Sequence, residues 1–156
     1  MLPRTKLHLL NHGYNTTFLL SLVCYTLSLC FVSAKTDTME YHGYFLLLFG
    51  WMSFGLNGHF FCWLANLVYI ICSCIMIRKA KSLFWVSLLL PFLGVLMLFE
   101  ETFPNFEGGA ALPFTVSTGY WLWLVALLLM TLACILLRVR NARKEPEYSR
   151  RFSTDL

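Results

Sequence analysis

The sequence predicts an all-α fold: a four-transmembrane-helix bundle with an additional apolar segment before the second helix. The first observation is composition. Of 156 residues, 58% are hydrophobic and only 13% are charged, whereas a soluble domain has about 25% charged residues. The second is that the apolar residues form four blocks of about 18–19 residues, none containing an acidic or basic side chain. The third is that nearly all basic residues fall on one side of these blocks.

The four predicted helices have the length of a bilayer span. They cover residues 17–34, 59–77, 82–99 and 119–137. At 1.5 Å per residue each helix is about 27–28 Å long, which matches a hydrocarbon core of about 30 Å. The sequence therefore predicts one membrane domain over 17–137, a cytoplasmic segment 1–16 before it and a basic cytoplasmic tail 138–156 after it.

The basic residues predict the orientation. Of the twelve Lys and Arg residues, only Lys35 lies between the first and second helices; the others precede the first helix, join the second to the third, or follow the fourth. The positive-inside rule therefore places both termini in the cytoplasm. The tail is expected to lose its helix at Pro146. It opens with four basic residues that are expected to contact anionic lipid headgroups: Arg138, Arg140, Arg143 and Lys144.

The first helix has a competing interpretation. Its basic start, its apolar run and the small residues before Lys35 also resemble a signal peptide with a cleavage site, and cleavage would leave three spans. As a retained helix, it presents a stripe of small residues that allow helices to approach closely: Thr17, Ser21, Cys24 and Ser28.

The segment 43–58 is too short to span a bilayer and too apolar for a free loop. If it continued into the second helix, the single helix would be about 52 Å long, so we expect Gly50, Gly55 and Gly58 to interrupt it. The segment is either a helix lying in the outer interface or a re-entrant segment packed against the bundle. Three aromatic residues suited to the headgroup level favour the interfacial form: Tyr41, Tyr44 and Trp51.

A polar face on the second helix is the main candidate site. Five residues recur at steps of three and four: His59, Cys62, Asn66, Tyr69 and Ser73. Polar groups are costly in lipid, so this face is expected to point into the bundle. It either lines a ligand or ion pocket or forms hydrogen bonds between helices.

The last two predicted helices carry packing signals. In the third, Pro91 and Gly94 predict a kink. In the fourth, the seven-residue spacing of Gly119, Ala126 and Ala133 predicts a close-packed seam.

The outer side offers a second, weaker candidate. Glu100, Glu101 and Glu107 are expected to form a solvated acidic rim. His42 and His59 lie on the same side, and two histidines with a carboxylate can hold a metal ion. No close spacing supports such a site, so no metal is expected.

Enzymatic chemistry is not indicated. The predicted spans contain no acidic residue of the kind that proton-coupled transport uses, no nucleophile–base set and no facing histidines for haem. The six cysteines lie within the predicted helices and are interpreted as packing residues, although Cys30 and Cys62 are both near outer ends, where one disulfide is conceivable. We expect neither catalytic residues nor a cofactor.

Two stretches carry a resemblance, "GWMSFGLNGHFFCWLAN" and "TGYWLWLVALLL". Over residues 43–137 the chain resembles a group of small, functionally uncharacterised bacterial inner-membrane proteins. The matching positions, with one more residue between the Gly and the Trp than in that pattern, are Gly58, Phe60 or Phe61, Trp63, Ala65 and Asn66. The resemblance implies a bacterial membrane protein and no particular activity.

The sequence therefore predicts a multi-pass membrane protein, and the resemblance implies that its membrane is the bacterial inner membrane. The leading hypothesis is a non-catalytic accessory or regulatory subunit of a larger complex, because so small a bundle leaves broad apolar faces uncovered. The alternative is a small homo-oligomeric transporter or channel that uses the polar face of the second helix. The expected partners are the bilayer, its anionic lipids, and a larger membrane protein or further copies of the chain, but not nucleic acid.

Overall fold

The computed structural model describes the backbone of residues 4–53, 57–77, 84–103 and 112–153, and the side chains of 13–53, 59–77, 84–102 and 112–142. Helices dominate the described chain: α1 (Arg4–Cys30), α2 (Gly43–Phe49), η1 (Gly50–Ser53), α3 (Asn57–Ile77), α4 (Phe84–Ser87), α5 (Leu89–Val95), η2 (Leu96–Phe99) and α6 (Thr118–Ser153). The strands are β1 (Val32–Thr36), β2 (Glu40–His42), β3 (Thr102–Phe103) and β4 (Leu112–Val116).

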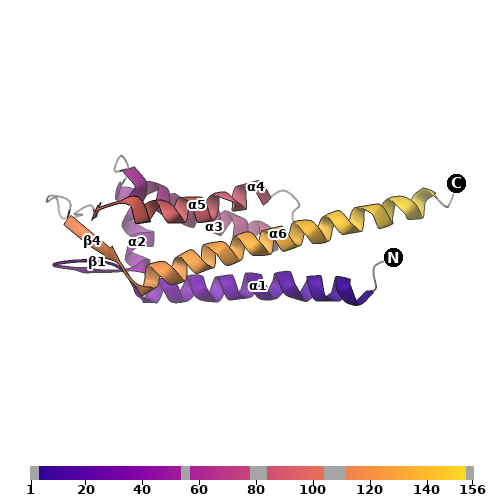
Figure 1. Ribbon diagram of the computed structural model, residues 1–156, viewed down its shortest axis with the longest axis horizontal. Coiled ribbons are helices and arrows are strands. Elements are labelled where there is room, and N and C mark those ends of the chain that lie inside the picture. The colour runs from indigo at the N-terminus through magenta and orange to yellow at the C-terminus, as the bar shows by residue number, and fades with distance from the viewer. Residues whose placement is uncertain (1–3, 54–56, 78–83, 104–111, 154–156) are drawn as a thin grey trace.

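The long helices lie along one axis (Figure 1). α1 and α6 are neighbours and run in opposite directions, while α3 and the segment formed by α4, α5 and η2 lie beside them along the same axis. The short helix α2 runs across this axis near the strands, and both termini lie at the opposite end of the bundle (Figure 1).

The all-α prediction is correct only in part, because a small sheet caps one end of the bundle. Its strands are antiparallel and lie in the order β2-β1-β4-β3. Ala34 at the centre of the sheet pairs with Tyr41 on one side and Val116 on the other, and it is fully buried. The central pairing, between β1 and β4, joins segments far apart in the sequence, so no local hairpin pattern predicted it.

The first helix differs from the predicted range 17–34 at both ends. α1 is helical from Arg4, so most of the predicted segment 1–16 belongs to it. Its last predicted residues instead turn into β1 after Cys30, where the Phe31 carbonyl accepts a hydrogen bond from the Gly43 N–H at 3.1 Å. These main-chain groups have partners in neighbouring segments rather than in the helix, which favours the strand.

Two helices are long and apolar enough to cross a membrane. They are His59–Ile77 within α3 and Thr118–Ala142 within α6, and they contain the predicted second and fourth spans. The prediction that the tail stops being helical at Pro146 is wrong, because α6 continues to Ser153. A proline removes one backbone hydrogen bond, but its neighbours here are mainly Glu, Lys and Arg, which have high helix propensity.

The third predicted helix, 82–99, is broken rather than simply kinked. α4 ends at Ser87, and α5 contains Pro91. Because Pro91 has no N–H, the Ser87 carbonyl four residues earlier lacks its usual helical donor. The Thr131 hydroxyl of α6 donates a hydrogen bond to that carbonyl at 2.8 Å. A side chain of a neighbouring helix therefore replaces the bond that the proline removes.

Two further side chains attach this broken helix to the bundle near its other end. The Cys62 thiol donates to the Leu93 carbonyl at 3.3 Å, and the Tyr120 hydroxyl donates to the Gly94 carbonyl at 2.9 Å. The donors come from α3 and α6, so both long apolar helices hold the broken helix in place.

The small-residue seams predicted on the first and fourth helices meet in the structure. Ala126 and Ala133 are fully buried, and the buried Ser21 hydroxyl of α1 donates to the Ala126 carbonyl at 2.7 Å. Gly119 lies so close to the start of β1 that an added Cβ would be 2.5 Å from the Ser33 Oγ atom. Small side chains thus allow α1 and α6 to pack closely.

Candidate functional site

Asn66 is the centre of a buried polar cluster between three helices. Its Oδ1 atom accepts hydrogen bonds from the Tyr25 hydroxyl of α1 at 3.0 Å and from the Trp123 indole Nε1 of α6 at 2.8 Å. The side chain is 8% exposed. A polar side chain on α3 thereby joins α1 and α6 in the interior, where hydrogen bonds have few competing partners.

A second buried cluster lies one helical turn further along α3. The Tyr69 hydroxyl is 2.9 Å from the Ser21 Oγ atom. The Tyr69 and Tyr25 rings are stacked, with centroids 4.2 Å apart. These buried side chains occupy the polar face of α3 between Asn66 and the end of the bundle that carries the termini.

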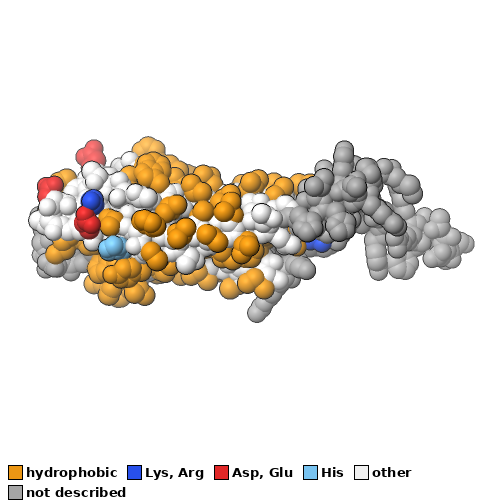
Figure 2. All heavy atoms as spheres, turned by 90° about the horizontal axis from the view of Figure 1, so that it is seen from below, with side chains coloured by type: hydrophobic (Ala, Val, Ile, Leu, Met, Phe, Trp, Pro, Cys, Tyr) orange, Lys and Arg blue, Asp and Glu red, His pale blue; other side chains and the backbone are white. Residues whose placement is uncertain are grey.

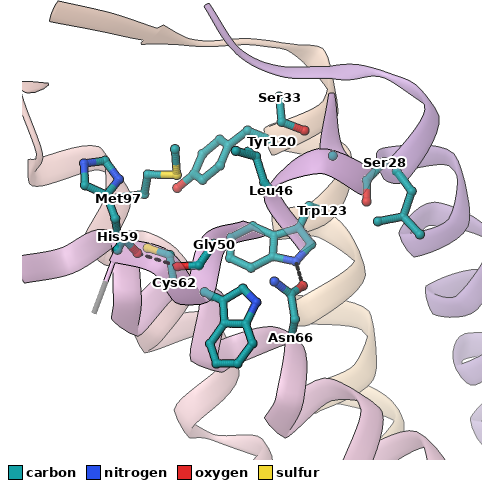
Figure 3. A pocket seen from close by; sticks show the side chains of 14 residues that line it. Ser28, Ser33, Leu46, Gly50, His59, Cys62, Asn66, Met97, Tyr120 and Trp123 are labelled. Carbon is teal, nitrogen blue, oxygen red and sulfur yellow. Dashed lines mark hydrogen bonds between the residues drawn. The ribbon is translucent and has the colours of Figure 1, made fainter. Parts of the chain in front are cut away.

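A cavity of about 70 Å³ lies on the other side of Asn66, toward the sheet end of the bundle. Figure 3 shows side chains that line it, which come from both the long helices and the cap. The described lining residues are Ser28, Leu29, Ser33, Gly43, Leu46, Gly50, Ser53, His59, Cys62, Trp63, Asn66, Met97, Tyr120 and Trp123. None of these is Lys, Arg, Asp or Glu, so the described wall is apolar with a few neutral polar groups.

Trp63 fixes α2 and η1 over this cavity. Its indole Nε1 donates to the Leu47 carbonyl at 2.9 Å. Its ring also lies against Gly50, where an added Cβ would be 2.6 Å from the Trp63 Cδ1 atom. Gly50 has ordinary helical backbone angles, so its main role is to leave room for Trp63 rather than to reverse the chain.

The expected glycine breaks have different outcomes. At Gly50 the α-helix changes to the 3-10 helix η1, whereas Gly58 lies inside α3, which begins at Asn57. Gly55 lies outside the described residues.

The amide of Asn66 has a defined orientation. An indole N–H can only donate, so the atom that faces Trp123 must be the amide oxygen. The Nδ2 group therefore points the other way, and Figure 3 shows it on the side away from Trp123. No side chain or carbonyl of the described residues accepts its hydrogens.

The other donors of the cavity wall are largely engaged. The hydroxyl, thiol and indole groups of the following residues donate to main-chain carbonyls: Ser28, Ser53, Cys62, Trp63 and Tyr120. The Asn66 amide is therefore the group best placed to bind a molecule in the cavity.

The structure divides the predicted polar face of α3 into two parts. His59, Cys62 and Asn66 line the cavity. Tyr69 is buried below it, and the half-buried Ser73 donates to the Tyr69 carbonyl of its own helix at 2.9 Å. The face does turn inward, but only its first three members share a site.

Of the acidic residues expected at the rim, the described Glu100 and Glu101 do not line the cavity. Glu101 is exposed and Glu100 is half-buried, while Glu107 lies outside the described residues. Within the described part of the chain, no group of three or more His, Cys, Asp or Glu side chains is placed to hold a metal ion. His42 contacts the Cys30 carbonyl at 3.2 Å and His59 contacts the Thr102 carbonyl at 2.6 Å, so both rings link the cap to the helices.

All six cysteines are free, and the conceivable Cys30–Cys62 disulfide is not formed. Cys30 is exposed and contacts the Thr26 carbonyl, whereas Cys62 is buried against Leu93.

The basic residues at the start of the tail lie at the opposite end of the bundle from the cavity. The Arg138 guanidinium lies over the Phe84 ring, 4.1 Å from its centroid, and that of Arg140 lies 5.0 Å from the centroid of Tyr14. The Arg140 Nε atom is buried without a partner among the described residues. The side chains of Arg143 and Lys144 lie outside the described part of the chain.

Sequence reasoning missed the aromatic half of the site. Tyr25 follows Ser21 by four residues and so continues the small polar stripe of α1, a signal that was available. The indoles of Trp63 and Trp123 carried no such signal, because an aromatic residue in an apolar helix is equally consistent with lipid contact.

No protein-family model matches the chain, and no curated protein or solved structure matches it significantly.

Proposed function

We propose that the chain is a four-pass protein of the bacterial inner membrane with both termini in the cytoplasm. α1, α3, the broken helix and α6 share one axis, and the strands gather at one end (Figure 1). α1 has 27 residues, or about 40 Å of helix, and Phe84–Phe99 provides about 24 Å or slightly more, so both are near the thickness of a bilayer. In a membrane, the carbonyls of a broken helix need hydrogen-bond donors from neighbouring segments. The side chains that donate to the carbonyls around Pro91 meet this need.

The distribution of surface side chains supports this placement. Figure 2 shows hydrophobic side chains over the middle of the visible face and acidic side chains near the sheet end. Lys35, the basic residue of that end, is paired with Glu40 at 2.6 Å. The described Arg138 and Arg140 lie toward the other end, so the charge asymmetry follows the positive-inside rule.

Within that membrane we propose a non-catalytic accessory or regulatory subunit of a larger complex. The observation that carries this proposal is a contrast between the interior and the surface. The buried polar side chains of the bundle are largely bonded to main-chain carbonyls or to one another. Large apolar side chains on all four spans stay exposed, among them Leu19, Ile71, Trp85, Phe92 and Leu128. A surface of this kind suits both lipid and the helices of a partner.

The homo-oligomeric transporter or channel has less support. Such a protein would need a continuous path along the polar face of α3. On this face, beyond Asn66, the side chains of Tyr69, Ser21 and Tyr25 contact one another, which argues against such a path.

Purification in a mild detergent followed by mass spectrometry tests the proposal. We expect a larger membrane protein in stoichiometric amount, and isolation of the pure chain as a homo-oligomer would contradict the subunit proposal and favour the alternative. The matched variant is Ile71→Ser, which changes an exposed residue and should weaken partner recovery only if that face of α3 is the contact. Loss of the whole chain from the membrane fraction would instead contradict the four-pass placement.

A further inference from the structure

We propose that the cavity beneath α2 and η1 binds the ester carbonyl of a membrane lipid, with the Asn66 amide as the hydrogen-bond donor. This inference rests on the membrane placement proposed above but not on the identity of any protein partner. It begins from a polar group that is more than nine-tenths buried and still has hydrogens to donate.

The amide hydrogens of Asn66 favour a ligand that carries a hydrogen-bond acceptor. Both bonds that the side chain makes use its oxygen, and the amide nitrogen faces the cavity (Figure 3). This nitrogen is open to the cavity and has no hydrogen-bond partner among the described residues, so an acceptor placed there gains a hydrogen bond worth about 0.5–1.5 kcal/mol. A molecule that presents an oxygen lone pair to Asn66 therefore gains more in this cavity than a purely apolar one.

The side chains that line the cavity favour a neutral polar group attached to an apolar chain. No Lys or Arg side chain is among the described lining residues, so a phosphate or carboxylate would be desolvated without a counter-charge. Leu29, Leu46 and Met97 offer contacts for methylene groups. Water is the competing occupant: it usually needs two to four polar partners. Five polar side chains of the wall already donate to main-chain carbonyls, whereas the Ser33 hydroxyl has no such bond within the described part of the chain.

The volume limits what can lie wholly inside the cavity. A cavity of roughly 150 Å³ accommodates a benzene ring, so about 70 Å³ is too small for the ring of a quinone. A carbonyl with a few methylene groups fits this space, and the rest of the lipid would extend outside it.

The position of the cavity also fits an ester. Asn66 is about 10 Å along α3 from His59, taking 1.5 Å per residue. α2 crosses the bundle axis (Figure 1). It exposes Tyr44 and Leu48, and η1 exposes Trp51, as an interfacial helix does. The cavity therefore lies close to the boundary where lipid headgroups join their acyl chains.

A comparison of ester and ether lipids tests the proposal. The purified chain is inserted into nanodiscs of a diester phosphatidylcholine or of its diether analogue, which has the same chains and headgroup but no carbonyl. Lipid retained after extraction is counted by native mass spectrometry. We expect one retained lipid, held about fivefold more often when it is the ester, the difference that one net hydrogen bond makes.

Two variants separate the Asn66 donor from general stability. Asn66→Asp keeps an oxygen for Tyr25 and Trp123 and, once its carboxyl is ionised, has no hydrogen to donate. The preference for the ester should therefore disappear at a pH high enough to ionise that carboxyl. Thr131→Val removes a buried hydrogen bond outside the cavity wall and should leave the preference unchanged.

The wild-type comparison decides the matter even if Asn66→Asp fails to fold. Equal retention of ester and ether lipid by the inserted wild-type chain would mean that water or nothing fills the cavity, and it would overturn the ester proposal alone. Displacement of the ester lipid by added ubiquinone-2 would assign the carbonyl to a quinone and overturn it as well. A chain that does not insert at all would overturn this proposal together with the membrane placement.

Discussion

At the scale of single residues, Asn66 matters because one oxygen serves two buried donors. The bonds from Tyr25 and Trp123 both end on Oδ1, and each donor belongs to a different helix. Removing the acceptor is therefore more damaging than removing either donor, because an orphaned buried donor costs more than a lost bond.

This asymmetry predicts the order of two substitutions. Asn66→Leu leaves the Tyr25 hydroxyl and the Trp123 indole unsatisfied and should lower the free energy of unfolding by about 2–4 kcal/mol. Tyr25→Phe keeps the ring stacked on Tyr69 and leaves Oδ1 bonded to Trp123, so it should cost about 1 kcal/mol. Denaturant titration in detergent measures both, and a larger loss for Tyr25→Phe would show that the cluster is not organised around Asn66.

The residues of the site were only partly predictable. The three- and four-residue spacing of His59, Cys62 and Asn66 places them on one helix face, and the cost of polar groups in lipid turns that face inward. The spacing does not predict which residue of another helix contacts Asn66. That contact depends on the crossing angle of the helices and on their relative position along the bundle axis. The cavity was not predictable for the same reason.

At the scale of elements, the broken helix depends on its neighbours. The carbonyl of Ser87 cannot bond to Pro91, and the Thr131 hydroxyl takes the place of the missing N–H. Proline signalled a kink in the sequence, but the donor that makes the break tolerable lies on α6 and is not visible from local sequence.

A double-mutant cycle tests this substitution of donors. In the wild type, Thr131→Val leaves the Ser87 carbonyl without a donor and should cost about 1–2 kcal/mol. In a Pro91→Ala background, the new main-chain N–H at that position can donate to Ser87, so the same change should cost clearly less. Stability measurements on the four proteins give the coupling energy, and independent, additive effects would contradict the proposed role of Thr131.

The glycines of α1 and α2 give a matched pair of opposite predictions. An added Cβ at Gly43 would clash with the main-chain carbonyl oxygen of Ser28, whereas one at Gly13 meets nothing within 4 Å. Gly43→Ala should therefore destabilise the chain by about 1–3 kcal/mol or more. Gly13→Ala should stabilise it by up to about 1 kcal/mol, because alanine favours the helix. Thermal unfolding of the two variants compares them directly, and equal shifts would show that α2 is not packed against the end of α1.

At the scale of the whole molecule, the bundle has one capped end and one end that carries the termini (Figure 1). The helical content and the two longest apolar helices followed from composition and block length, which depend on local sequence. The sheet did not, because Ala34 and Lys35 pair with Val116 and Thr115, which lie far away in the sequence. Long-range pairing of short strands leaves little trace in either segment alone.

The orientation of this asymmetric molecule is the central claim, and cysteine labelling tests it most directly. In a background where the exposed Cys30 and Cys74 are replaced by Ser, one variant carries Asp37→Cys beside β1 and another carries Ser153→Cys at the end of α6. We predict that a membrane-impermeant maleimide labels the first variant from outside intact cells and the second only after the membrane is permeabilised. Labelling of both positions from the same side would contradict the four-pass architecture.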